Sequence, residues 1–229
     1  MREQRITIEY IKMLKRQVFT TREISDMSGK NMSAVTQALN YLSRHNIVKK
    51  LYRGIWVEVT DKLISPYMLI SHLFRTKRVY VSFLSALHLH GIIKQIPQTI
   101  TLASTLHSRK IETTICTFAV HQLSPGFFSG FDWYKENEKF LIAEPEKALA
   151  DCLYLFTRKK KQYGYFPELN FHNHFSIKKT REWINKIPDK KAGLHAGEKF
   201  EELLNYYKKD YKEKKLSKYT GKRILSLKL

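Results

Sequence analysis

Residues 1–60 carry the hydrophobic pattern that most limits what this chain can fold into. In residues 3–17 apolar side chains recur at three- and four-residue spacing, which predicts a first helix. Thr20 and Glu23 have the spacing of a capping box, and Gly29 is suited to end the short helix that follows. The predicted core positions of these two helices are Tyr10, Ile11, Leu14, Val18, Ile24 and Met27.

A third helix is predicted from about Asn31 or Ser33 to His45, and two strands follow it. The buried stripe expected on this helix consists of Val35, Ala38, Leu39 and Leu42. The strand-like runs 47–52 and 55–59 are rich in Ile, Val, Tyr and Trp, and Arg53-Gly54 between them suits a hairpin turn. Helix, short helix, helix and two-stranded ribbon is the order of a winged helix-turn-helix, which we predict for residues 1–60.

In that architecture the third helix enters the major groove of double-stranded DNA. Polar residues on the groove-facing side are then expected to reach base edges, and Gln and Asn suit bidentate contact with adenine. The base-reading candidates are Ser33, Thr36, Gln37 and Asn40. The candidates for contact with phosphates or the neighbouring minor groove are Lys30, Arg44, Lys49, Lys50 and Arg53. The alternative is a winged helix that contacts only protein.

Positive charge is concentrated at the two ends of the chain. Residues 1–60 hold 11 basic and 5 acidic residues, residues 61–157 hold 10 and 8, and residues 158–229 hold 20 and 8. A polyanionic partner accounts for such an excess, because each phosphate that Lys or Arg neutralises releases condensed counterions. For the C-terminal end the alternative is a lysine-rich surface that only maintains solubility.

Composition narrows the class of protein further. A hydrophobic content of 43% with 13% aromatic residues is typical of a globular protein. The apolar runs are far shorter than the roughly 18 residues that a membrane span needs. Residues 1–20 contain no secretory apolar segment, so we expect a cytoplasmic protein. Cys116 and Cys152 are then expected to be reduced thiols, with a disulfide between them as the alternative.

Residues 61–229 are predicted to form a larger mixed α/β domain, which makes the whole chain α+β. Helices are expected at residues 66–75, between Ser82 and Gly91, and after Pro145. Strands are expected at residues 98–104, 111–121 and 139–143. The basic end has apolar residues at helical spacing, which predicts amphipathic helices: Trp183, Ile184, Ile187, Phe200, Leu203, Leu204 and Tyr207. Their basic face is expected either to bind nucleic acid or to be solvated.

The sequence favours a protein without catalytic, metal or cofactor sites. Glu144, Glu146 and Lys147 resemble the acidic cluster of a metal-dependent nuclease, but they open a predicted helix at a proline, which accounts for them without chemistry. His88 and His90 are two positions apart, so on a helix they face nearly opposite ways and cannot share an ion. No glycine-rich phosphate loop occurs.

Three segments in order resemble motifs of the AbiEi family of type IV antitoxins. They are residues 51–56 (LYRGIW, with Trp56 where the family usually has Tyr), residues 80–92 (YVSFLSALHLHGI) and residues 142–151 (IAEPEKALAD). The resemblance covers most of residues 1–155. Because the pattern of residues 82–91 is typical of a capped helix, we expect these motifs to have a structural role and not to form a binding or catalytic site.

This resemblance implies a bacterial transcriptional repressor whose N-terminal domain binds inverted repeats in its own promoter, as two cooperating copies. It also implies an antitoxin, with a role in phage defence, that opposes a nucleotidyltransferase-fold toxin encoded next door. Two other functions remain open on the residues themselves. One is an adaptor that binds another protein through residues 61–229, and the other is a nuclease or RNA-binding effector that uses the basic C-terminal surface.

Overall fold

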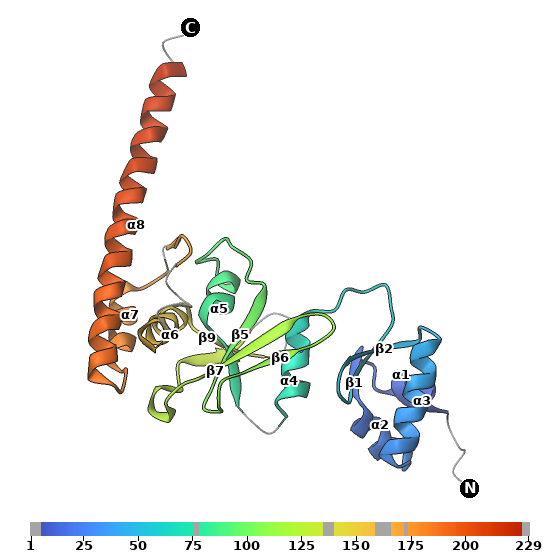
Figure 1. The fold of residues 1–229 in the computed structure, drawn as a ribbon. Helices are drawn as coiled ribbons and strands as arrows, with labels where there is room; N and C mark the ends of the chain where they lie inside the picture. The colour runs from blue at the N-terminus through green and yellow to red at the C-terminus, as the bar shows by residue number, and fades with distance from the viewer. Residues whose placement is uncertain (1–5, 76–77, 135–139, 159–165, 172–173, 226–229) are drawn as a thin grey trace.

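The computed structural model describes residues 6–75, 78–134, 140–158, 166–171 and 174–225, and for residues 210–225 it describes the backbone (Figure 1). Within these residues the chain is a mixed α+β protein with eight α-helices and two sheets. None of the described helices combines the length and the apolar character that a membrane span requires.

The N-terminal part contains three helices and a small antiparallel sheet. Its elements in chain order are α1 (Thr7–Met13), β1 (Val18–Thr20), α2 (Thr21–Ser28), α3 (Met32–Arg44), β2 (Val48–Tyr52) and β3 (Ile55–Glu58). The strand order is β1-β3-β2, so the central strand is the last one in sequence.

The predicted boundaries of α2 and α3 are confirmed by their caps. Thr20 Oγ1 accepts a hydrogen bond from the Glu23 backbone N–H at 3.2 Å, and the Glu23 carboxylate accepts one from the Thr20 N–H at 2.8 Å. Gly29 ends α2 with a φ of 70°. Asn31 caps α3 by accepting from the Ala34 N–H at 2.8 Å.

The first helix ends earlier than predicted, and Val18 does not belong to it. Residues 3–5 of the predicted helix lie outside the described residues. Lys15 has a φ of 50°, so the helical path ends before residue 17. Val18 instead begins β1, where it pairs with Val57 of β3. A strand of three residues is too short to show a period in the sequence, and its pairing partner lies 39 positions away.

One predicted core position and one predicted strand end in this part are wrong. Met27 of α2 is 39% exposed, and Val59 lies beyond the end of β3 and is 50% exposed. Both residues lie at the end of an element, where hydrophobicity alone does not reveal whether a neighbouring segment covers the side chain. Ala38 and Leu42 of the α3 stripe are half-buried, whereas Val35 and Leu39 are fully buried.

The second sheet has six strands in the order β6-β7-β5-β4-β9-β8, with both parallel and antiparallel pairs. Its strands are β4 (Val79–Val81), β5 (Thr99–Ser104), β6 (Arg109–Glu112), β7 (Thr117–Gln122), β8 (Phe131–Trp133) and β9 (Leu141–Ala143). The helices of this part are η1 (Pro66–Leu69), α4 (Ile70–Leu73), α5 (Phe83–Leu89), η2 (Pro125–Phe127), α6 (Pro145–Arg158), α7 (Ile177–Asn185) and α8 (Lys190–Leu225).

The predicted single strand 111–121 is wrong, because this segment is part of the β6–β7 hairpin. The chain reverses between Thr113 and Cys116, and the Thr113 hydroxyl donates to the Cys116 carbonyl at 2.7 Å. Thr113, Thr114 and Ile115 of this turn are β-branched and favour a strand, so the composition gives no sign of the reversal.

The other predicted elements of this part differ from the structure mainly at their ends. Strands β4 and β8 were not predicted, and the segment predicted as one helix at 66–75 is η1 followed by α4. The predicted strand 139–143 is β9 from Leu141 onward, and its first residue lies outside the described residues.

Helix α6 is the centre of the larger core and packs against α5, α7 and α8 (Figure 1). The predicted core face of α6 is buried, namely Ala148, Leu149, Cys152 and Leu153. All of residues 146–155 are buried, including the charged residues Glu146, Lys147 and Asp151. Cys116 and Cys152 are free thiols.

The small N-terminal sheet is covered on both faces. Phe19, Trp56 and Val48 pack with the three helices α1, α2 and α3 in one core cluster. Val18, Leu51, Ile55 and Val57 belong to the large core that includes the second sheet. This explains why Ile55, Trp56 and Val57 are all buried in succession.

Candidate nucleic-acid interface

Helix α3 presents a continuous polar stripe to solvent. Ser33, Gln37, Asn40 and Arg44 are all exposed and follow one another at spacings of four, three and four residues, which is one face of a helix. The opposite side holds Val35 and Leu39, which anchor α3 against α1, α2 and β2. The structure therefore brings four of the predicted DNA-contacting residues together on one rigid surface.

Thr36 and Lys30 are placed differently from the other candidates. The Thr36 hydroxyl donates to the Met32 carbonyl at 2.7 Å, and its side chain is half-buried. Lys30 is half-buried in the turn before α3, where its carbonyl accepts from the Ser25 hydroxyl at 2.6 Å. The hydroxyl of Thr36 is thus already committed as a donor, which leaves it only acceptor capacity toward a base.

The β2–β3 hairpin presents Lys49, Lys50 and Arg53, all of which are exposed. The pairing of β2 with β3 shifts register between Lys50 and Tyr52, which marks a bulge at Leu51. The hairpin is short, and its turn is held against α2, because the Gly54 carbonyl accepts from the Thr21 N–H at 3.0 Å. These cations therefore sit on the edge of the sheet and not on a long free arm.

A second segment braces this hairpin, and no local pattern in the sequence indicates it. The Thr114 N–H donates to the Leu51 carbonyl at 3.1 Å, and its hydroxyl donates to the Lys50 carbonyl at 3.4 Å. A hollow of about 380 Å³ lies beside this contact, lined by residues 50–53 and 112–114. The β6–β7 turn thus touches the strand that carries two of the predicted phosphate contacts.

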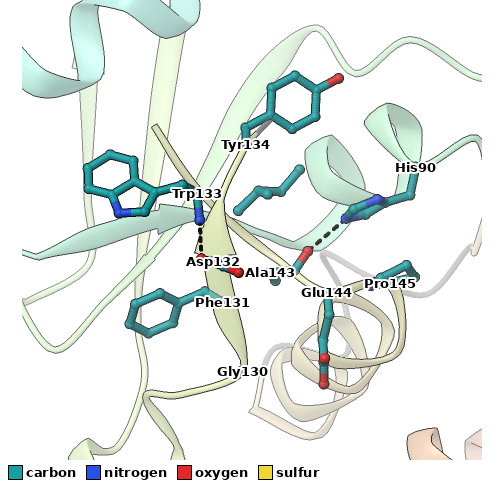
Figure 2. Close-up of a pocket in the computed structure, with 10 residues that line it drawn as sticks. His90, Gly130, Phe131, Asp132, Trp133, Tyr134, Ala143, Glu144 and Pro145 are labelled. Carbon is teal, nitrogen blue, oxygen red and sulfur yellow. Dashed lines mark hydrogen bonds between the residues drawn. The ribbon is translucent and has the colours of Figure 1, made fainter. Parts of the chain in front are cut away.

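A larger hollow of about 550 Å³ lies at one edge of the six-stranded sheet (Figure 2). It is lined by His90, by the segment 130–134 around β8, and by the segment 142–145 that enters α6. Figure 2 shows the His90 ring directed at the Ala143 carbonyl, to which Nε2 is bonded at 2.7 Å, and Trp133 on the other side of β8. Trp133 is 61% exposed.

The acidic and basic residues near this hollow are engaged in contacts within the protein. The Glu144 carboxylate contacts the Lys179 ammonium at 2.6 Å and the Trp183 indole N–H at 2.5 Å. The Glu146 carboxylate accepts from the Ser176 N–H at 2.8 Å. Two of the three residues that resembled a nuclease cluster therefore join the start of α6 to α7 and the residue that caps it.

The third, Lys147, forms a fully buried ion pair with Asp151 one turn later on α6. Asp151 also accepts from the Ser82 hydroxyl at 2.7 Å and from the Tyr80 hydroxyl at 3.1 Å. The Lys147 ammonium lies 3.6 Å from the centre of the Phe127 ring. Burial lowers the pKa of Lys147 and raises the pKa of Asp151, and the charge of each partner opposes these shifts.

The residues of the two longer sequence motifs are thus joined to each other inside the core. Ser82 belongs to the first motif, and Lys147 and Asp151 belong to the second. Among the described residues, no group of three His, Cys, Asp or Glu side chains is arranged to hold a metal ion. The polar stripe on α3 is consequently the strongest candidate for a binding site.

No model of a known protein family matches this sequence, and a search of curated proteins finds no match either. The resemblance to AbiEi antitoxins therefore rests on the three short motifs alone. Any function assigned to the chain depends first on the geometry of α3 and its surroundings.

Proposed function

We propose that this protein is a DNA-binding transcriptional repressor that reads double-stranded DNA with α3. The single observation that carries the proposal is the exposed stripe of Ser33, Gln37, Asn40 and Arg44 on a helix anchored by a compact core. An α-helix fits the major groove, and Gln, Asn and Arg side chains are suited to the hydrogen-bonding edges of bases. This combination supports sequence reading better than any other surface of the described chain.

The order of the N-terminal elements supports a winged helix-turn-helix as the setting for this helix. Helices α2 and α3 are joined by the tight turn at Gly29, and β2 and β3 follow as a hairpin that pairs with β1. In such a unit the hairpin flanks the recognition helix and contacts the DNA backbone. Lys49, Lys50 and Arg53 are the exposed cations that would do so here.

The antitoxin part of the proposal rests on the motif resemblance alone. The buried contacts of Asp151 are compatible with an antitoxin but do not favour one. On this proposal the repressor controls its own operon as two copies on a promoter repeat, and it opposes a nucleotidyltransferase-fold toxin. Co-expression with such a toxin from the adjacent gene should restore growth. Unrelieved growth arrest would remove the antitoxin role and leave the repressor role standing.

Selection from a pool of random duplexes followed by gel shifts across a salt series tests the DNA-reading proposal. The selected duplex should bind at least about 10³-fold more tightly than a shuffled duplex. Gln37→Ala and Asn40→Ala should each weaken binding to the selected duplex by about 1–3 kcal/mol and leave shuffled duplex unchanged. Lys49→Ala and Arg53→Ala should weaken binding to both duplexes.

The matched control is Asn205→Ala, which removes an exposed amide from α8 and should change neither affinity. Equal binding of selected and shuffled duplexes at physiological salt would overturn the proposal. If Asn205→Ala and Asn40→Ala had the same effect, α3 would not be the reading helix.

A further inference from the structure

The last helix, α8, contains 36 residues and divides into two parts of different character. Its first part packs against α6 and α7 through Ala196, Phe200 and Leu204, all of which are buried. Tyr207 stacks edge-on against Phe171. Beyond this contact α8 extends away from the body of the molecule (Figure 1).

The extended part, residues 208–225, is strongly basic. It contains eight Lys and Arg residues and two acidic residues, whereas residues 61–157 carry 10 basic and 8 acidic residues. Lys208 and Lys209, where its side chains are described, are exposed. A helix of this length spans about 27 Å, at about 1.5 Å per residue.

We infer that residues 208–225 of α8 form a second binding site, which takes the phosphodiester backbone of a nucleic acid independently of its sequence. At about 100° per residue, the eight cations fall within an arc of about 220° around the helix, together with Tyr211 and Tyr219. Asp210, Glu213 and Ser217 fall within the remaining arc. Lysine and tyrosine are groups that contact phosphate oxygens, and neutralised phosphates release counterions.

Two other occupants fit this segment less well. A helix that lies in a membrane surface needs a continuous apolar face. Here Leu216 falls between Arg223 and Lys209 around the helix, so cations interrupt any such face. A second copy of α8 would bring like charges together, which opposes pairing. A polyanion complements the excess of positive charge on residues 208–225.

Helices α3 and α8 lie at opposite ends of the molecule (Figure 1). The second site is therefore separate from the stripe on α3 and does not depend on the function proposed for it. A protein with both sites could hold two nucleic-acid segments, one by sequence and one by charge.

The test measures binding of a random-sequence 20-base-pair DNA duplex by the full chain across a salt series. The variant changes Lys208, Lys209, Lys212, Lys215 and Lys218 to Gln, which has a similar helix propensity. The matched control changes five exposed lysines elsewhere to Gln, namely Lys62, Lys94, Lys178, Lys190 and Lys191. Both variants lose the same net charge.

The α8 variant should lose about tenfold or more in affinity at low salt, and the slope of log K against log salt should fall by about 3. The control should change neither quantity. A third variant with Arg at the five α8 positions should bind as the original chain does, which separates loss of charge from loss of fold. Helix content by circular dichroism should be the same in all of them.

The same series in a Gln37→Ala/Asn40→Ala background separates this inference from the proposed function. The loss caused by the α8 variant should persist there, even if α3 reads no sequence. An RNA duplex of the same sequence shows whether affinity depends on the sugar of the backbone. Binding of either duplex through α8 supports the inference. Equal losses in the α8 variant and the control would overturn it, as would binding of anionic vesicles but neither duplex.

Discussion

At the scale of single residues, the start of α2 depends on Glu23. Its carboxylate bonds the Thr20 N–H and hydroxyl and pairs with Arg16. Burial raises the pKa of Glu23, but the hydrogen bonds from Thr20 and the charge of Arg16 outweigh it and hold the pKa below its usual value. A lowered carboxyl pKa adds stability above the unfolded pKa of about 4.3, and this stability is lost as the pH falls through the folded pKa.

The prediction is that Glu23→Gln costs about 1 kcal/mol of unfolding free energy at pH 7, and that this difference shrinks below about pH 4. Denaturant unfolding at several pH values measures it. Glu9→Gln, at an exposed position on α1, is the control and should show a smaller effect at pH 7. A Glu23→Gln difference that stays constant down to about pH 3 would contradict the capping role.

The buried pair of Lys147 and Asp151 gives a second prediction at this scale. Asp151→Asn leaves the Lys147 ammonium buried without a counter-charge and should cost about 3–5 kcal/mol. Lys147→Met together with Asp151→Asn should recover much of the loss, since Asn retains an acceptor for Ser82 and Tyr80. Thermal unfolding of the two variants measures the difference. If the double variant were as unstable as Asp151→Asn, the unpaired charge of Lys147 would not be the cause of the lost stability.

At the scale of elements, the angle between α2 and α3 is set at Gly29. Its φ of 70° lies in the left-handed region, which disfavours residues with a Cβ, although open space surrounds the position that a Cβ would take. Gly29→Ala should therefore cost about 1 kcal/mol by backbone strain alone. Gly29→Asn should cost less, because Asn tolerates this region.

For a chain of this size, about 1 kcal/mol corresponds to about 2–4 °C in Tm. Calorimetry on the two variants should therefore rank them with Gly29→Asn above Gly29→Ala. If strain moves α3, affinity for the selected duplex should fall along with Tm in the Ala variant. Equal Tm values for Ala and Asn would mean that the turn relaxes to another conformation.

At the scale of the whole molecule, the covered second face of the small sheet decides how the N-terminal part behaves. Val18, Leu51, Ile55 and Val57 pack into the large core, so residues 1–61 alone would expose them as one apolar face. We expect that fragment to self-associate in sedimentation experiments. Val57→Thr should reduce self-association of the fragment, because a hydroxyl weakens an exposed apolar face.

In the full chain the same Val57→Thr substitution should be harmful, because Val57 is buried there. There it places a hydroxyl among buried apolar groups and should cost about 1–3 kcal/mol of unfolding free energy. The control is Val59→Thr, at a residue that is 50% exposed, which should have little effect in either context. A monomeric fragment that Val57→Thr leaves unchanged would show that the two parts fold independently.

Much of the N-terminal part was predictable because its signals are local. The capping box at Thr20, the glycine at Gly29 and the stripe of Val35 and Leu39 each depend on residues within a few positions of one another. The exposure of Gln37 and Asn40 follows from the same helical period. Strand β1 was missed because its pairing with β3, 39 positions away, determines it. The β6–β7 reversal was missed because the residues of its turn are largely β-branched and favour a strand.

The sequence by itself determined that residues 20–58 form two capped helices followed by two short strands, and that α3 keeps a polar side. Only the tertiary structure decided what covers the other surfaces. The small sheet is buried on both faces, Thr114 braces the hairpin, and Asp151 of one motif accepts a hydrogen bond from Ser82 of another. Helix periods are set by neighbouring residues, whereas burial and the bond between Ser82 and Asp151 depend on segments tens of residues apart, which a linear pattern does not encode.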